Sequence, residues 1–186
     1  MEYLRESNLA HHDVKLDNLV LDENWNLKLV DFGSAVPIFD DDDKAIFYNS
    51  DQDPEWQKGT CNYMPPEVIK SNLSFDQGYT AEKIDIFSVG IIGYAMRYKR
   101  YPFEMMNEKT NIKAYRAYIS SDDAKSTPYK NFLYKLLVEQ PEKRIGFDEV
   151  MKEPFMREAT ATNAEVKKYL DQYYLPILKS QRSLQN

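Results

Sequence analysis

Four polar side chains near the start of the chain have the types and spacing of a site for metal ions and proton transfer. Asp13, Lys15 and Asn18 lie within one short segment, and Asp31 follows after the next apolar stretches. Carboxylate and carboxamide oxygens are the ligands that hard cations such as Mg²⁺ prefer. A single acidic residue beside a turn is usually only solvated, so the chemistry depends on whether the chain brings these residues together.

The stretch between Asn18 and Asp31 predicts how they meet. Two short apolar segments, 19–21 and 27–30, flank a polar turn, and this pattern is typical of an antiparallel hairpin. A turn centred on Asn24 places Asn18 beside the end of the second segment and therefore beside Asp31. We expect all four polar side chains to share one site.

Such a site suits phosphoryl transfer, in which the protein mainly positions groups and neutralises developing charge. In this hypothesis Asp31 holds a Mg²⁺ ion that bridges the phosphates of ATP, and Asn18 holds a second Mg²⁺ ion. Asp13 accepts the proton of the substrate hydroxyl, while Lys15 reaches the transferred phosphoryl group as a compact positive charge. Gly33 is expected to let the chain turn away after the metal ligand.

The order of these residues resembles the catalytic and metal-binding loops of the protein kinase family. The segment HHDVKLDN at 11–18 resembles the catalytic loop, and DFG at 31–33 resembles the metal-binding loop. Later segments resemble further kinase motifs in the family's order: GTCNYMPPE at 59–67 the end of the activation segment, DIFSVG at 85–90 the start of the long buried helix, and PEKRI at 141–145 the late arginine motif. The resemblance covers residues 5–156.

The resemblance implies roles for further residues. Thr60 joins Asp13 and Lys15 in the catalytic set, and Lys15 with Thr60 matches serine/threonine kinases rather than tyrosine kinases. Glu67 is expected to form a buried, bidentate ion pair with Arg144. Structural roles are implied for His11, Phe32, Gly33, Glu67, Asp85 and Arg144.

Control by phosphorylation of the activation segment is not expected. His12 stands where the family usually places an arginine, and a neutral imidazole cannot form a bidentate contact with a phosphate. The acidic run at 40–43 is expected to be a solvated loop, because like charges repel one another. The alternative is that this run attracts basic residues of a protein substrate.

The resemblance implies a mainly helical fold, the large C-terminal lobe of a protein kinase, with a small β-hairpin that carries the catalytic and metal-binding loops. We assign residues 1–158 to the kinase domain and 159–186 to a helical C-terminal extension. No glycine-rich nucleotide loop or strand lysine precedes residue 1, so the small lobe is expected to be absent. Little kinase activity is therefore expected from this chain alone.

Apolar periodicity predicts the helices. We expect Thr80 to cap a buried helix that includes 86–96, and Asn163 to cap a last helix. The apolar stripe of that last helix either packs in the core or docks a partner. The other predicted helices are 111–119, 129–139 and 147–152, and β structure is predicted only for the hairpin.

Composition narrows the class of protein. A chain of 186 residues with 42% hydrophobic and 29% charged residues is ordinary for one globular domain. The net charge of −6 argues against nucleic acid as a partner and favours basic partners. The single Cys61 allows no internal disulfide, and neither a signal peptide nor a membrane-spanning stretch is visible. We expect an intracellular, cytoplasmic protein without a membrane partner, and leave its oligomeric state open.

Two functions remain open from the sequence. The first is a serine/threonine protein kinase, or a fragment of one, that transfers the γ-phosphoryl group of ATP to protein hydroxyls with the help of Mg²⁺. The second is a non-catalytic kinase lobe that binds substrates or a partner kinase without turnover. The intact polar set of Asp13, Lys15, Asn18 and Asp31 favours the first function, and the absent small lobe favours the second.

Overall fold

The computed structural model describes residues 2–48, 60–69, 79–102, 127–157 and 160–176. By its internal contacts the chain divides into a main unit, Met1–Asn18 with Asp31–Arg157, and a small unit, Leu19–Val30 with Glu158–Asn186. The helix predicted at 111–119 lies outside the described residues. The assignment of 1–158 and 159–186 to separate domains stays a prediction.

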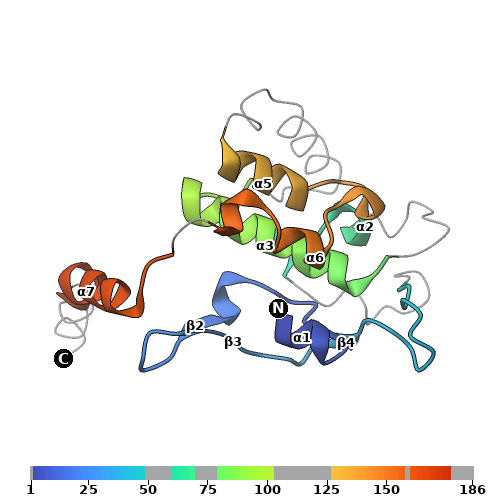
Figure 1. Cartoon of the computed structure of the whole chain (residues 1–186), viewed down its shortest axis with the longest axis horizontal. Helices are drawn as coiled ribbons and strands as arrows, with labels where there is room; N and C mark the ends of the chain where they lie inside the picture. The colour runs from blue at the N-terminus through green and yellow to red at the C-terminus, as the bar shows by residue number, and fades with distance from the viewer. Residues whose placement is uncertain (1, 49–59, 70–78, 103–126, 158–159, 177–186) are drawn as a thin grey trace. The chain divides into compact units, whose positions relative to one another are not determined.

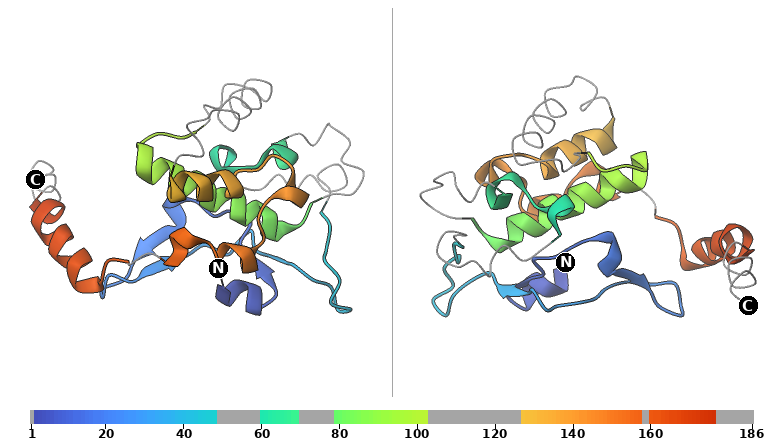
Figure 2. Two further views of the ribbon diagram at one scale, coloured as in Figure 1. Left: turned by 45° about the horizontal axis from the view of Figure 1, so that its top comes forward. Right: turned by 180° about the vertical axis from the view of Figure 1, so that it is seen from behind.

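The long helix α3 (Ala81–Tyr98) forms the centre of the main unit, drawn in green in Figures 1 and 2. Its buried residues lie on nearly every face, as expected for a helix enclosed by others. It begins after Thr80, as predicted, although the Thr80 side chain makes no capping hydrogen bond. It ends at Tyr98, and the C-cap residue Lys99 that follows has a left-handed φ of 58°.

Helix α5 (Pro128–Leu136) packs along α3, and two glycines allow the close approach. A Cβ atom on Gly90 would lie 2.8 Å from Leu137 Cδ2, and a Cβ atom on Gly93 would lie 2.9 Å from Leu133 Cδ2. The Tyr129 hydroxyl donates to the Gly93 carbonyl oxygen across the same contact. Any larger residue at these positions would separate the two helices.

Replacement of Gly90 by alanine should therefore destabilise the main unit. Overpacking costs about 1–3 kcal/mol, and the higher helix propensity of alanine returns about 1 kcal/mol, so we expect a net loss of up to about 2 kcal/mol in the free energy of unfolding. Urea denaturation measures this loss. Gly146→Ala is the control, because its Cβ would meet nothing closer than 3.7 Å. Equal midpoints for the two variants would contradict the packing argument.

The other helical elements of the main unit are short. They are α1 (Glu2–Glu6), α2 (Pro66–Ile69) and α6 (Phe147–Val150), with the 3-10 turns η1 (Leu16–Asn18), η3 (Cys61–Tyr63), η5 (Pro141–Lys143) and η6 (Pro154–Arg157). Both α5 and α6 confirm predicted helices but end earlier than predicted. One hydrophobic cluster joins α3, α5 and α6 through Ile86, Tyr94, Phe132, Leu133, Leu136, Ile145 and Val150.

Two small antiparallel sheets complete the described fold. In the small unit β2 (Leu19–Leu21) pairs with β3 (Leu27–Leu29), which confirms the predicted hairpin, and its register sets Leu19 opposite Leu29. In the main unit β1 (Leu9–Ala10) pairs with β4 (Val36–Pro37). The sequence did not predict this second pair, because strands of such length show no alternation. The described residues are thus mainly helical with small sheets.

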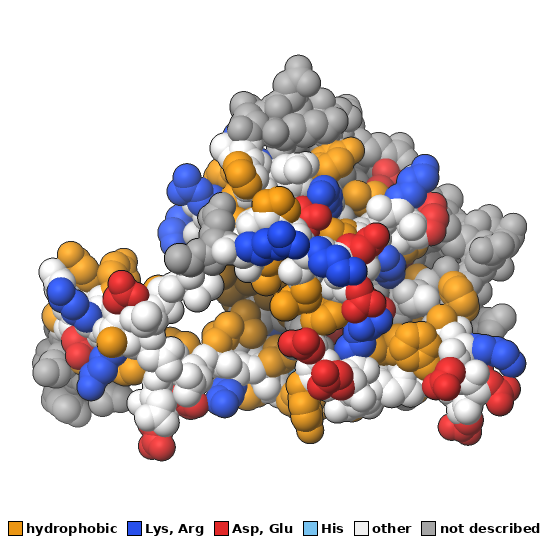
Figure 3. Space-filling view, in the orientation of Figure 1, with side chains coloured by type: hydrophobic (Ala, Val, Ile, Leu, Met, Phe, Trp, Pro, Cys, Tyr) orange, Lys and Arg blue, Asp and Glu red, His pale blue; other side chains and the backbone are white. Residues whose placement is uncertain are grey.

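The acidic run forms an exposed turn in the main unit, seen as red side chains at the lower right of Figure 3. Asp40 Oδ1 accepts hydrogen bonds from the backbone N–H groups of Asp42 and Lys44. A β-bridge between Phe39 and Ala45 closes the turn. The run is therefore a solvated loop, as expected, but one held in a fixed turn by its own side chain.

Helix α7 (Asn163–Tyr173) belongs to the small unit and starts differently from the prediction. Its cap is Thr162: Thr162 Oγ1 accepts from Glu165 N, and Glu165 Oε2 accepts from Thr162 N at 2.8 Å. The predicted cap Asn163 is wrong, since its Nδ2 donates instead to Asn26 Oδ1 in the hairpin turn. A threonine followed by glutamate three residues later is the usual signal of such a reciprocal cap.

The apolar stripe of α7 is not buried, contrary to one of the two expectations. Tyr169 and Tyr173 pack against each other with ring centroids 4.9 Å apart but remain exposed. Docking of a partner on this stripe stays a prediction. Among the described residues no helix is long and apolar enough to cross a membrane.

Candidate active site

A buried carboxylate on α3 fixes the backbone of the predicted catalytic loop. Asp85 Oδ2 accepts a hydrogen bond from His11 N at 2.6 Å, and Asp85 Oδ1 accepts one from His12 N at 2.8 Å. Burial raises the pKa of Asp85 to about 7, against the effect of these two bonds. The bonds hold the loop at His12, whose φ of 64° lies in the left-handed region. The structural role predicted for Asp85 thus has a physical basis.

His11 and Phe32 join the catalytic loop to the predicted metal-binding loop. His11 is fully buried, and its ring meets Phe32 edge-on with centroids 5.1 Å apart. His11 Nδ1 accepts a hydrogen bond from Asp13 N at 3.3 Å. These contacts are those of a packing residue, although Phe32 itself is half exposed.

His12 is buried and uncharged. Burial lowers its pKa to about 4, although the nearby Asp13 acts in the opposite direction. At neutral pH the imidazole is therefore neutral and offers no cation to a phosphate group. This observation agrees with the expectation that His12 does not bind a phosphate group on the activation segment.

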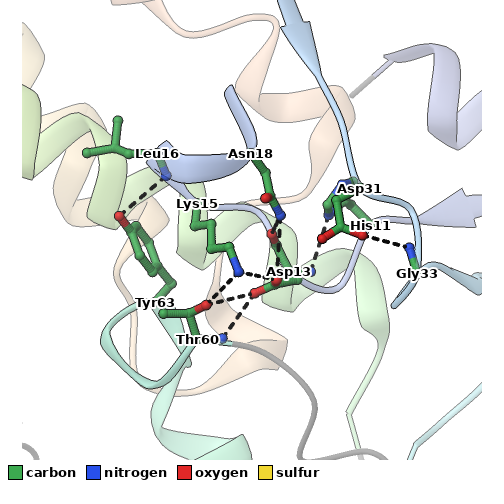
Figure 4. A network of polar contacts seen from close by, with 9 residues as sticks. All are labelled: His11, Asp13, Lys15, Leu16, Asn18, Asp31, Gly33, Thr60 and Tyr63. Atoms are coloured by element: carbon green, nitrogen blue, oxygen red, sulfur yellow. Dashed lines mark hydrogen bonds and ion pairs between the residues drawn. The ribbon is translucent and has the colours of Figure 1, made fainter. Parts of the chain in front are cut away.

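Asp13 lies at the centre of a polar network with Lys15 and Thr60 (Figure 4). Lys15 Nζ donates to Asp13 Oδ2 at 2.6 Å and to Thr60 Oγ1 at 2.9 Å. Thr60 donates to Asp13 Oδ1 from its backbone N at 3.0 Å and from Oγ1 at 3.2 Å. The bond to Asp13 raises the pKa of Lys15, which stays charged. The structure thus brings together the three residues predicted as the catalytic set.

Asn18 keeps its carbonyl oxygen available. Its Nδ2 donates to the Asp13 carbonyl oxygen at 2.9 Å, and its side chain is buried. No described residue donates a hydrogen bond to Asn18 Oδ1. Asn18 Oδ1, the atom predicted to bind a metal ion, therefore accepts no hydrogen bond from any residue that the structure describes.

Asp31 is exposed and lies beyond Asp13 when seen from Thr60 in Figure 4. Its Oδ1 accepts a hydrogen bond from Gly33 N at 3.3 Å. A Cβ atom on Gly33 would lie 3.2 Å from the same oxygen, so glycine provides space for the carboxylate. The chain does turn at Gly33, where Ala35 N donates to the Phe32 carbonyl oxygen, but the φ of Gly33 is not left-handed, so the need for glycine as a source of conformational freedom stays a prediction.

The oxygen atoms of Asn18 and Asp31 fit Mg²⁺ better than a metal that needs a full protein cage. Among the described residues no group of three or more His, Cys, Asp or Glu side chains could hold a metal ion. Mg²⁺ is commonly held by one or two carboxylates together with waters and phosphate oxygens. The donor set therefore suits a metal ion that arrives with a nucleotide.

The contacts of Tyr63 and Ser88 were not predicted from the sequence. Tyr63 lies in η3, and its carbonyl oxygen accepts a hydrogen bond from Ser88 Oγ at 3.1 Å. Its hydroxyl oxygen accepts one from Leu16 N at 3.4 Å. A usable signal was present, because Ser88 is a hydroxyl residue inside an apolar helix and a buried hydroxyl requires a partner.

A buried ion pair joins α2 to the segment after η5, as predicted. Arg144 Nη1 donates to Glu67 Oε1 at 2.6 Å, and Arg144 Nη2 donates to Glu67 Oε2 at 2.9 Å. Both side chains are almost fully buried. The guanidinium also donates to the carbonyl oxygens of Val138 and Lys83 and lies over the Phe87 ring. The pair therefore fixes the segment that follows Thr60 against the helices.

Comparison with known proteins agrees with this geometry. A family described as the protein kinase domain matches residues 1–156. A probable serine/threonine-protein kinase, CCRP1, from Zea mays is 33% identical over 86% of this chain and 24% of its own length. A CBL-interacting serine/threonine-protein kinase from Arabidopsis thaliana is 33% identical over 84% of this chain and 33% of its own length.

An Aurora kinase from Encephalitozoon cuniculi is 30% identical over 84% of this chain and 52% of its own length. The chain thus spans between a quarter and about half of the length of these three relatives. The family match covers most of the chain and contains every predicted site residue. This chain therefore belongs to the protein kinase family.

Proposed function

We propose that this chain forms the large, helical lobe of a serine/threonine protein kinase that transfers the γ-phosphoryl group of ATP to protein hydroxyl groups. The observation that carries the proposal is the network of Asp13, Lys15 and Thr60. A carboxylate, an ammonium group and a hydroxyl are held there within hydrogen-bonding distance of one another. The relatives, which are named as serine/threonine kinases, support the choice of substrate hydroxyl.

Each residue of the network has a distinct task in the proposed reaction. The contacts of Thr60 and Lys15 orient the Asp13 carboxylate. Its oxygens also accept a longer hydrogen bond from Asn18 Nδ2 at 3.5 Å, so a substrate hydroxyl would replace one of these donors when it gives its proton to Asp13. Lys15 remains charged and stabilises the negative charge that develops on the transferred group. Asn18 Oδ1 and the Asp31 carboxylate would hold Mg²⁺. When bound, Mg²⁺ neutralises the charge of the ATP phosphates.

We propose a basic protein as the substrate to test first. The chain has a net charge of −6, and the acidic side chains of residues 40–43 are exposed on one turn. Charge of this sign raises the local concentration of basic partners. The choice concerns the assay, and the phosphoryl-transfer proposal does not depend on it.

Radiolabelled ATP tests the proposed function directly. The chain, and a fusion that places the small lobe of a related kinase before it, are incubated with Mg²⁺, γ-labelled ATP and protamine. We expect the fusion to label serine and threonine but not tyrosine, and to lose the label when Mg²⁺ is chelated, whereas the chain alone should transfer little label. A folded fusion that labels no protein, or labels only tyrosine, would contradict the proposal.

Replacement of Asp31 tests the metal assignment. Asp31→Ala removes a charged oxygen ligand, so we expect the apparent affinity for Mg²⁺-ATP to fall by at least about tenfold, the lower end of the usual cost of disturbing a metal site. Calorimetric titration of ATP at several Mg²⁺ concentrations measures the change in the fusion. Asp41→Ala removes the same charge from the exposed turn and is the control. Unchanged Mg²⁺ dependence in Asp31→Ala would remove Asp31 from the metal site.

A further inference from the structure

The hydroxyl of Tyr63 is engaged on two sides behind the catalytic loop. Its oxygen accepts a hydrogen bond from Leu16 N at 3.4 Å (Figure 4) and lies 3.0 Å from the hydroxyl oxygen of Tyr101. The two tyrosine rings meet edge-on, with centroids 5.6 Å apart and an interplanar angle of 88°. Tyr63 is 3% exposed, whereas Tyr101, just after α3, is 37% exposed.

This hydroxyl is the second of two points at which the segment 60–63 holds the catalytic loop. Thr60, at the first point, bonds Asp13 and Lys15. Tyr63, at the second point, receives the N–H group of Leu16, the residue that directly follows Lys15. Movement of Leu16 would therefore move the backbone that carries the Lys15 ammonium group.

The contact with Tyr101 constrains the hydrogen bonds that the Tyr63 hydroxyl can form. A phenol has one proton and accepts hydrogen bonds at its oxygen. Either hydroxyl can be the donor in the bond between Tyr63 and Tyr101; when Tyr63 donates, its proton points to Tyr101 and its oxygen lone pairs stay available to Leu16 N. Burial, together with the bond to Tyr101, raises the pKa of Tyr63 to about 12, and the group keeps its proton at neutral pH.

We propose that Tyr101 is a positioning residue for phosphoryl transfer, acting through the Tyr63 hydroxyl on Leu16 and hence on Lys15 and Asp13. The inference rests on the proposed function and adds to it a residue from a distant part of the chain. Tyr101 contacts neither Asn18 nor Asp31 in any hydrogen bond of the described residues. Its effect should therefore fall on the transfer step and not on the binding of nucleotide.

Single hydroxyl deletions test the proposal, with Tyr101→Phe as the central variant because it keeps the ring. Tyr63→Phe removes the shared oxygen, and Tyr3→Phe, on a side chain that is 77% exposed, is the control. In the full chain we expect the Leu16 amide hydrogen to exchange about threefold to tenfold faster in Tyr101→Phe, the factor expected for one lost neutral hydrogen bond. NMR of the labelled chain measures this exchange without any need for activity.

Kinetics of the fusion supply the second measurement. We expect kcat to fall by about threefold to tenfold in Tyr101→Phe with the KM for ATP unchanged, by the same conversion of one lost hydrogen bond. The double variant Tyr63→Phe/Tyr101→Phe should be no slower than Tyr63→Phe, because Tyr101 acts through Tyr63.

The outcomes separate the inference from the proposed function. A Leu16 amide unaffected by Tyr101→Phe, or faster exchange with unchanged kcat, refutes the positioning role alone. An additive double variant refutes the route through Tyr63. A folded wild-type fusion without any transfer refutes the proposed function, and with it the catalytic part of the inference.

Discussion

Asp13→Asn is expected to lower kcat by about 10²–10⁴-fold, the usual contribution of a positioned proton acceptor. The carboxamide has nearly the same shape, so its oxygen can still accept from Thr60, as Asp13 Oδ1 does at 3.0 and 3.2 Å. Its nitrogen, however, cannot accept the substrate proton and replaces the oxygen that pairs with Lys15 at 2.6 Å. The affinity for ATP should change little, because Asn18 and Asp31 keep their oxygens.

The measurement is steady-state kinetics of the fusion with labelled ATP and protamine, after circular dichroism has shown that the variant folds. Asp171→Asn makes the same chemical change at an exposed position of α7 and should retain wild-type turnover. Wild-type turnover by Asp13→Asn would reject Asp13 as the proton acceptor. A loss of ATP affinity equal to the loss of kcat would instead assign Asp13 to nucleotide binding.

Arg144→Ala should lower the free energy of unfolding by about 3–5 kcal/mol, a large share of the stability of an ordinary domain. The change leaves the Glu67 carboxylate without its bidentate partner, and Glu67 is only 3% exposed. It also removes hydrogen bonds to the carbonyl oxygens of Val138 and Lys83. Arg144→Lys should recover only part of the loss, because an ammonium group cannot match both carboxylate oxygens.

Arg5 supplies a matched control for burial. It forms the same bidentate contact, to Asp148 at 2.7 and 2.8 Å, but these side chains are 36% and 61% exposed. Arg5→Ala should therefore cost less than about 1 kcal/mol. Urea denaturation of both variants gives the comparison. Similar urea midpoints for Arg144→Ala and Arg5→Ala would show that burial does not increase the loss of stability when the Glu67–Arg144 pair is broken.

Local patterns predicted those parts of the fold that local forces decide. The β2–β3 hairpin follows from apolar segments around a polar turn, and α3 follows from a long apolar stretch. The β1–β4 pair joins short segments that are far apart in the sequence, and nothing within either segment marks it as a strand. The cap of α7 was missed although Thr162 and Glu165 carry its signal, because Asn163 is also a common capping residue.

In the candidate site, too, some contacts were predicted from the sequence and others were not. The order of Asp13, Lys15, Asn18 and Asp31 predicted one site, and in the structure Lys15 and Asn18 each donate a hydrogen bond to Asp13. The pairing of Tyr63 with Tyr101 could not be read from the sequence, which has 14 tyrosines and no feature that selects two of them. Their contact depends on how the end of α3 meets the activation segment, which only the folded chain determines.

The glycines at the contact of α3 and α5 are expected to make the two helices one cooperative folding unit. Each glycine weakens an isolated helix by about 1 kcal/mol relative to alanine, so α3 depends on α5 for its stability. Helix α3 carries Asp85, which holds the backbone of the catalytic loop. Opening of α5, which contributes no residue to the candidate site, should therefore release the loop as well. The amides of α3, α5 and the loop would then share one free energy of opening.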